Sequence, residues 1–176
     1  MINMRVFYIM HLINYKGASN MKLSIGMIVK NESKYLERCL TALKPILDNV
    51  TSELIIVDTG STDGTVDIAK RFTDKVLYCQ WNNDFSEARN KTLEKAEGDW
   101  YFYLDADEML ENPEEIINFF CSNAHLEYQA FAIKIENLVD ENRNSVVEVF
   151  YSKRIVKRDK SLKFKGKIHE YLPEKS

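Results

Sequence analysis

Two aspartates separated by one alanine, Asp105 and Asp107, directly follow a run of bulky apolar residues at positions 100–104. Tryptophan, tyrosine, phenylalanine and leucine in one run are typical of a buried strand, which should end near Leu104 because acids do not belong in it. Side chains two positions apart on an extended chain lie on the same face, so both carboxylates should converge at the carboxyl end of a central strand. Such a pair suits Mg²⁺ or Mn²⁺ carrying a phosphorylated substrate. Asp-x-Asp alone is a weak signal, and a solvated acidic loop explains it about as often.

Polar side chains also follow two earlier apolar runs, at residues 23–29 and 54–57. Asn31 and Glu32 leave the first run, and Asp58 closes the second. We expect the two runs to be neighbouring strands, so that these side chains meet at one edge of the sheet. Each also has a structural alternative, since Asn31 and Glu32 can cap the next helix and Asp58 can accept hydrogen bonds from the amides of its own turn.

Three further candidates lie later in the chain. Asp84 and Arg89 sit in and just after the loop that follows the third expected strand. Arg89 can pair with a diphosphate or with Asp107, whereas Asp84 can contact a nucleotide or simply cap its helix. His169 follows a glycine turn, and as a third ligand it would complete a mixed oxygen–nitrogen metal site that favours Mn²⁺. A lone histidine is more often structural.

The elements that must position these residues alternate strand and helix from residue 22 to about residue 121. Apolar runs and helical spacing predict strands at 23–29, 54–57, 75–79 and 100–104, and helices at about 33–47, 66–72, 86–96 and 113–121. Pro45 should bend or end the first helix. Later strands are expected at 128–138, 146–151, 154–156 and 162–164, with a polar turn at 140–144. Strand–helix units followed by antiparallel strands predict an α/β fold with a mostly parallel sheet and a mixed, antiparallel C-terminal extension.

Composition narrows the class of protein. The chain has 176 residues, 45% of them hydrophobic, which predicts one globular domain at residues 21–176 after an amphipathic or disordered extension at residues 1–20. A net charge of −3 gives no sign of a nucleic-acid partner, and we interpret the late basic cluster around Arg154 as a solvated face. Three scattered cysteines and no apolar run as long as a membrane span predict a cytoplasmic protein.

Five short motifs together resemble one family. They are VKNE at 29–32, VDTGSTDGT at 57–65, DFSEARN at 84–90, LDAD at 104–107 and GKIHE at 166–170. In this order they resemble a family 2 glycosyltransferase of the GT-A fold, the Rossmann-like fold of nucleotide-diphospho-sugar transferases, over about residues 22 to 172. Five motifs in order are far more specific than any one of them.

The resemblance implies a metal-dependent nucleotide-sugar site. It implies that Asp107 binds Mn²⁺ or Mg²⁺, that Asp105 contacts ribose or the metal, and that Asp58 accepts the N3–H of uracil and so favours a UDP-sugar. Many relatives carry a second acid after this one, where this chain has Thr59, and the departure weakens the case for a strict choice of UDP. The resemblance also implies that four further residues lie around the donor nucleotide: Asn31, Glu32, Asp84 and Arg89.

The C-terminal motif supplies the remaining catalytic candidates. By resemblance, His169 is the third metal ligand. Glu170 is the candidate general base. In an inverting transfer the acceptor attacks the anomeric carbon from the face opposite the leaving group, and a base on that face must deprotonate it. Glu108 and Glu111 are alternatives for that role.

The sequence therefore predicts a hexosyltransferase that acts on a UDP-sugar and on an acceptor glycan, lipid or peptide. A nucleotidyltransferase is an alternative, although it would normally carry a glycine-rich basic loop after its first strand, which residues 30–32 do not provide. The other alternative is a non-catalytic nucleotide-sugar-binding remnant, or a fragment of a larger transferase. The sequence does not address the oligomeric state.

Overall fold

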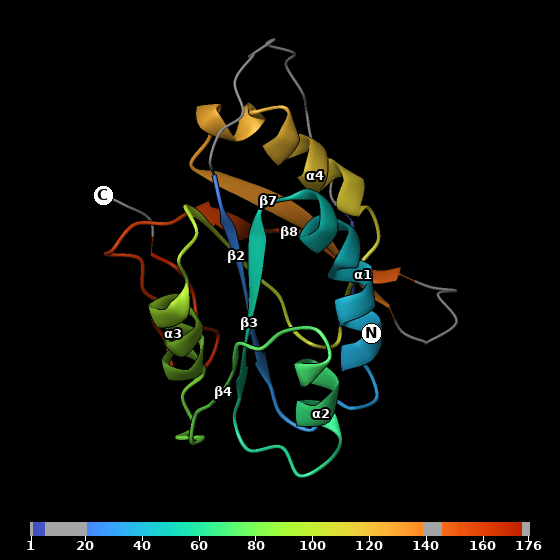
Figure 1. Ribbon diagram of the computed structural model, residues 1–176, viewed down its shortest axis with the longest axis vertical. Coiled ribbons are helices and arrows are strands. Elements are labelled where there is room, and N and C mark those ends of the chain that lie inside the picture. The colour runs from blue at the N-terminus through green and yellow to red at the C-terminus, as the bar shows by residue number, and fades with distance from the viewer. Residues whose placement is uncertain (1, 6–20, 139–145, 174–176) are drawn as a thin grey trace.

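The computed structural model describes residues 2–5, 21–138 and 146–173, which form one eight-stranded sheet with helices on both faces (Figure 1). The strands lie in the order β4-β3-β2-β5-β8-β7-β1-β6. Their bounds are β1 Ile2–Arg5, β2 Leu23–Val29, β3 Ser52–Asp58, β4 Val76–Tyr78, β5 Trp100–Tyr103, β6 Glu108–Leu110, β7 Ala130–Leu138 and β8 Val146–Lys157. The helices are α1 Leu36–Asn49, α2 Thr65–Lys70, α3 Phe85–Lys95 and α4 Pro113–Cys121, followed by a 3₁₀-helix, Ala124–Glu127.

The parallel part of the sheet is centred on β2, which pairs with β3 and β5 while β3 pairs with β4. β2 is buried along nearly its whole length, as expected for an apolar strand covered on both faces. β8 and β7 continue the sheet from β5 in antiparallel order. The predicted α/β fold with a mostly parallel sheet and a mixed extension is confirmed.

The helices form a layer on each face of the sheet. α1, α2 and α4 lie on one side and α3 lies on the other (Figure 1). The larger core lies between the sheet and the helices α1 and α4, and it includes Leu40 and Trp100. A smaller core under α3 includes Tyr101 and Phe164. Among the described residues, no helix is both long enough and apolar enough to cross a membrane.

The N-terminal residues differ from the sequence interpretation. Residues 2–5, expected in an extension before the domain, form β1, which pairs antiparallel with β7 and parallel with β6. Pairing at this position depends on strands distant in the sequence, so a local pattern does not reveal it. Residues 6–20 and the expected turn at 140–144 lie outside the described residues.

The structure corrects two local predictions. Pro45, expected to bend or end the helix, does not end α1; the helix buries apolar side chains on both sides of the proline, and this burial outweighs its cost of about 3 kcal/mol. β8 runs unbroken to Lys157, and residues 162–164 are not a strand. Phe164 is instead buried edge-on against Tyr103, with ring centroids 5.0 Å apart, so packing explains its apolar character.

Candidate functional site

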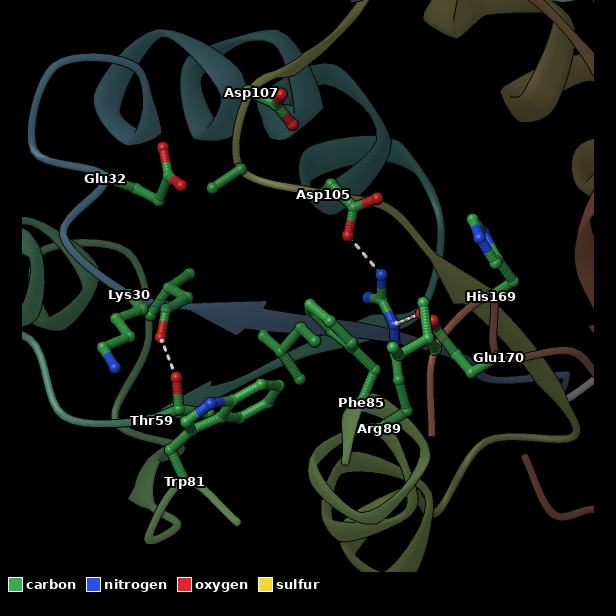
Figure 2. Close-up of a pocket in the computed structure, with 14 residues that line it drawn as sticks. Lys30, Glu32, Thr59, Trp81, Phe85, Arg89, Asp105, Asp107, His169 and Glu170 are labelled. Atoms are coloured by element: carbon green, nitrogen blue, oxygen red, sulfur yellow. Dashed lines mark hydrogen bonds and ion pairs between the residues drawn. The ribbon is translucent and has the colours of Figure 1, made fainter. Parts of the chain in front are cut away.

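A cavity of about 570 Å³ opens at the carboxyl ends of β2, β3 and β5 (Figure 2). The candidates from the sequence that line it are Glu32, Arg89, Asp105, Asp107, His169 and Glu170. The candidates that do not line it are Asn31, Asp58 and Asp84. In Figure 2, Lys30 and Glu32 lie at one end and the His169–Glu170 pair lies at the other, with Asp105 between them. The chain thus brings most of its predicted site residues to one place.

The two aspartates lie in a turn after β5, not in the strand itself. The amide of Glu108 donates to the carbonyl oxygen of Asp105 at 3.1 Å, and the amide of Asp105 donates to Oε2 of Glu108 at 2.8 Å. Strand alternation therefore does not explain why Asp105 and Asp107 both face the cavity. The turn closed by Glu108 does.

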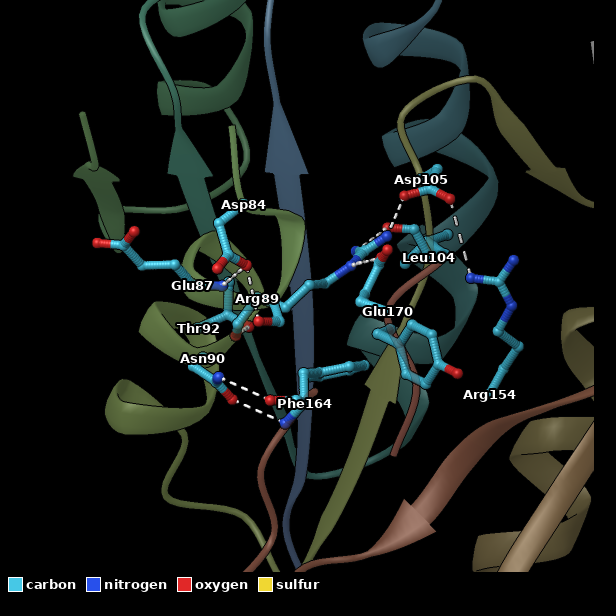
Figure 3. A network of polar contacts seen from close by, with 12 residues as sticks. Asp84, Glu87, Arg89, Asn90, Thr92, Leu104, Asp105, Arg154, Phe164 and Glu170 are labelled. Atoms are coloured by element: carbon cyan, nitrogen blue, oxygen red, sulfur yellow. Dashed lines mark hydrogen bonds and ion pairs between the residues drawn. The ribbon is translucent and has the colours of Figure 1, made fainter. Parts of the chain in front are cut away.

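Arg89 of α3 is buried beneath the cavity, with 2% of its side chain exposed. Its guanidinium donates to the carboxylates of Asp105 and Glu170 and to the carbonyl oxygen of Leu104 (Figure 3). Burial alone would lower the pKa of Arg89, but the neighbouring carboxylates raise it; Arg89 in turn lowers the pKa of Asp105 against the opposing effect of burial. One charged side chain thus joins α3, the end of β5 and the C-terminal loop.

Arg154 of β8 is not part of a solvated basic face, as its sequence context suggested. Only 12% of its side chain is exposed, and Nη2 donates to Oε1 of Glu108 at 2.5 Å. Its Nη1 lies 3.9 Å from Oδ2 of Asp105. Burial raises the pKa of Glu108, and the charge of Arg154 opposes that shift. Both carboxylate oxygens of Glu108 are engaged, so Glu108 holds the turn and is not available as a general base.

Glu32 and Asp107 line the cavity without an ion pair to any described residue. Burial raises the pKa of Glu32, and the charges of Asp107 and Asp105 raise it further. Burial and Asp105 likewise raise the pKa of Asp107. Within the described ranges, no three acidic, histidine or cysteine side chains are grouped closely enough to hold a metal ion by themselves. The oxygen donors still fit a hard cation that is held by one or two carboxylates together with substrate phosphates.

The side chains of Asp58 and Asn31 both accept hydrogen bonds from backbone amides of the loop after β3. The carboxylate of Asp58 accepts hydrogen bonds at 3.1 Å from the amides of Gly60 and Ser61. Asn31 has a φ of 54°, and its side chain accepts a hydrogen bond from the amide of Thr62 at 2.8 Å. The contacts of Asp58 are the turn contacts considered as its alternative, whereas the bond between Thr62 and Asn31 joins the loops after β2 and β3. A role of either side chain toward a nucleotide stays a prediction.

The helix α3 fastens the C-terminal loop to the site. Asp84 caps α3 through a backbone amide of its first turn, and the amide of Phe85 donates to a carbonyl oxygen of the loop at 2.9 Å. The side chain of Asn90 bonds to both backbone groups of Phe164, at 3.1 and 2.8 Å (Figure 3). The motifs at 84–90 and 166–170 are therefore parts of one structural unit.

Sequence reasoning missed the aromatic wall of the cavity. Trp81 lies in the loop after β4 and Phe85 begins α3, and both line the cavity with ring centroids 4.8 Å apart in a T-shaped contact. The sequence feature that could have revealed this wall is a tryptophan in an otherwise polar loop. His169, by contrast, was singled out; it is exposed, with a φ of 55°, and its role as a metal ligand stays a prediction.

Comparison with known proteins gives a family. The model described as glycosyl transferase family 2 matches residues 24–171. The SPbeta prophage-derived glycosyltransferase SunS of Bacillus subtilis is 33% identical over 160 residues, which cover 89% of this chain and 36% of SunS. A TPR repeat-containing protein of Synechococcus elongatus is 45% identical over 96 residues, which cover 54% of this chain and 23% of that protein. The chain thus spans little more than a third of the length of SunS.

Solved structures are similar to part of the chain. S. aureus TarS 1–349 has a TM-score of 0.49 and 26% identity, over 60% of this chain and 33% of that chain. M. tuberculosis glucosyl-3-phosphoglycerate synthase has a TM-score of 0.46 and 25% identity, over 51% of this chain and 36% of that chain. The family match spans most of the chain and includes all of the residues that line the cavity. The chain belongs to glycosyl transferase family 2 and has the GT-A fold.

Proposed function

We propose that this chain transfers a sugar, a hexose by preference, from a UDP-sugar to an acceptor, with inversion at the anomeric carbon. The observation that carries the proposal is the cavity where Arg89, Asp107 and Glu170 converge in a family 2 chain. The acceptor would be a glycan, a lipid or a peptide. Membership in this family does not support the nucleotidyltransferase alternative.

The donor diphosphate is assigned to the acidic part of the cavity. Mn²⁺ or Mg²⁺ held there by Asp107 and Asp105 would stabilise the negative charge that the leaving diphosphate gains in the transition state. Arg89 fixes Asp105 from below, and Glu108 with Arg154 fixes the turn. These contacts orient the carboxylate of Asp105 and fix the turn that carries Asp107.

Glu170 is proposed as the general base. An acceptor oxygen would attack the anomeric carbon as the bond from that carbon to the diphosphate oxygen breaks, and Glu170 would take the acceptor proton. Arg89 Nε holds one oxygen of Glu170 at 3.1 Å, which orients the carboxylate and leaves its second oxygen for this role. His169 beside it is the candidate additional metal ligand.

The test is release of UDP from a panel of UDP-sugars by the 176-residue chain in the presence of Mn²⁺. We expect at least one donor to be hydrolysed slowly, because water can replace a missing acceptor. The matched variants are Asp107→Asn, which should abolish release, and Asp48→Asn on the exposed surface of α1, which should not change it.

The outcomes separate the alternatives. Release that is unaffected by Asp107→Asn would contradict the metal site. No release by a folded protein that binds UDP would instead support a nucleotide-sugar-binding protein without turnover. No release and no nucleotide binding would contradict the proposed function as a whole.

A further inference from the structure

The cavity has an aromatic wall to which the proposed roles assign nothing. Trp81 and Phe85 stand at the edge where the loop after β4 meets the start of α3, and Phe85 is 40% exposed. Their rings are held at 72° to one another. The backbone amide of Phe85 is tied to the C-terminal loop, so the wall is part of a fixed framework. Large apolar side chains left exposed in a concave site commonly contact a ligand.

The position of this wall shows which part of a donor it would meet. In Figure 2, Trp81 lies beside Thr59 at the carboxyl end of β3, whereas Arg89 and Glu170 lie at the other end of the cavity. A nucleotide-sugar with its reacting carbon near Glu170 would therefore extend its nucleoside toward Thr59 and Trp81.

Few other groups at this end can hold a base. The carboxylate of Asp58 is engaged by two amides of its own turn and does not line the cavity. Thr59 lines the cavity, but its hydroxyl donates to the carbonyl oxygen of Val29 at 3.2 Å. Lys30 is a cation that suits phosphate or ribose better than the face of a base. The group that remains to hold a base is Trp81, with its large π-surface.

We propose that Trp81, supported by the edge-to-face contact with Phe85, is the stacking platform for the nucleobase of the donor. The inference rests on the proposed function and names the subsite that binds the nucleoside. Stacking on an aromatic face gains affinity from any base, because every base has a π-face. Base affinity at this site would come mainly from stacking and less from the carboxylate of Asp58.

Tryptophan fluorescence tests this directly, because the chain has two tryptophans and they lie in different environments. Trp100 is 1% exposed and packs edge-on against Phe119 and Phe120 in the larger core. A ligand in the cavity should therefore change the emission of Trp81 alone. Mg²⁺ is the cation to use, since paramagnetic Mn²⁺ quenches fluorescence by itself.

The probes are UDP and inorganic pyrophosphate, which shares the diphosphate but lacks the base. We expect UDP to quench emission and pyrophosphate to bind without quenching. Trp81→Ala should weaken UDP binding about tenfold or more and leave pyrophosphate binding unchanged, whereas Trp81→Phe should retain most of the UDP affinity. Calorimetry supplies the affinities of the variants, and circular dichroism checks their fold.

Two results separate this inference from the proposed function. If Trp81→Ala binds UDP as tightly as the wild-type protein, or if pyrophosphate quenches as strongly as UDP, the stacking platform is wrong and the donor site stands. If the wild-type protein binds neither UDP nor another nucleoside diphosphate, both proposals are overturned.

Discussion

At the amino edge of the sheet, Glu53 is surrounded by groups that satisfy its charge, whereas Glu32 and Asp107 at the carboxyl edge have no such partners among the described residues. Glu53 accepts hydrogen bonds from Ser24 Oγ at 2.5 Å and from Lys75 Nζ at 2.5 Å. Burial would raise the pKa of Glu53, but its hydrogen bonds lower it to about 2. The pKa values of Glu32 and Asp107 shift the opposite way.

The difference separates structural acids from candidate functional ones. A carboxylate with its hydrogen-bond and ion-pair partners in place stabilises the fold. Neighbouring carboxylates without such partners lower the stability until a cation binds to them. The carboxyl edge contains both kinds, because Asp105 and Glu108 form ion pairs with Arg89 and Arg154, whereas Asp107 forms no ion pair with a described residue. We infer that Asp107 binds a ligand, the cation that would accompany the donor diphosphate.

The largest expected effect is on stability at the amino edge. Glu53→Gln should lower the free energy of unfolding by about 2 kcal/mol at pH 7, because hydrogen bonds to a charged group are lost. Urea denaturation measures this. UDP affinity should not change, and a weakened donor site in this variant would break the separation between the two edges.

The pH dependence of stability gives a second readout of Glu53. Its pKa in the folded protein, about 2, lies below the ordinary value of 4.5. Its contribution is therefore complete above pH 4.5 and is lost as the pH falls through about 2. The stability gap between the wild-type protein and Glu53→Gln should narrow over that range. A gap that stays constant would contradict the assignment.

The converse change is Asp107→Asn. It should weaken metal-dependent UDP binding by about tenfold or more, which is about 1.4 kcal/mol. The free energy of unfolding should stay the same or rise slightly, because the change removes a partly buried charge that forms no ion pair with a described residue. Calorimetry and urea denaturation measure the two quantities. A loss of stability comparable to that of Glu53→Gln would mean that Asp107 is structural.

A smaller effect is expected where α3 holds the C-terminal loop. Asn90→Ala removes both hydrogen bonds to the backbone of Phe164 and should cost about 1 kcal/mol. Asn90→Asp keeps an acceptor for the amide of Phe164 and should cost less. Thermal unfolding ranks the variants. Equal stability of all three proteins would show that these bonds do not hold the loop.

The smallest expected effect concerns His169. His169→Ala should lower Mn²⁺ affinity in the presence of UDP by a few-fold, about 1 kcal/mol or less, because one exposed ligand is lost among several. Mn²⁺ titration in the presence of UDP measures the change, with His169→Gln as the matched variant. An unaltered titration in both variants would assign His169 a structural role.

Much of the fold could be predicted because apolar runs and helical spacing in the sequence indicate the individual strands and helices. The apolar run ending at Leu104 and the abrupt change to acid at Asp105 mark the end of β5. Helical spacing located α1, whose apolar periodicity continues past Pro45 to Leu47. The pairing of residues 2–5 was not predicted, because it depends on β7 and β6 being in place.

The candidate site was predictable where a residue type has few ordinary uses. Asp107 and Arg89 are such cases, and both line the cavity. Arg154 was missed because in the sequence it is one of several cations, and only the antiparallel pairing of β8 with β5 brings it to Glu108. Trp81 was missed because an aromatic residue in a loop normally suggests packing.

The most direct measurement is calorimetric titration of the wild-type protein with UDP, with and without Mn²⁺. The account predicts that UDP binds with Mn²⁺ and binds at least about tenfold more weakly without it, because Asp107 and the diphosphate repel each other unless a cation lies between them. Equal affinity in both conditions, in a folded sample, would contradict the claim that the carboxyl edge of the sheet is a metal-dependent nucleotide-sugar site.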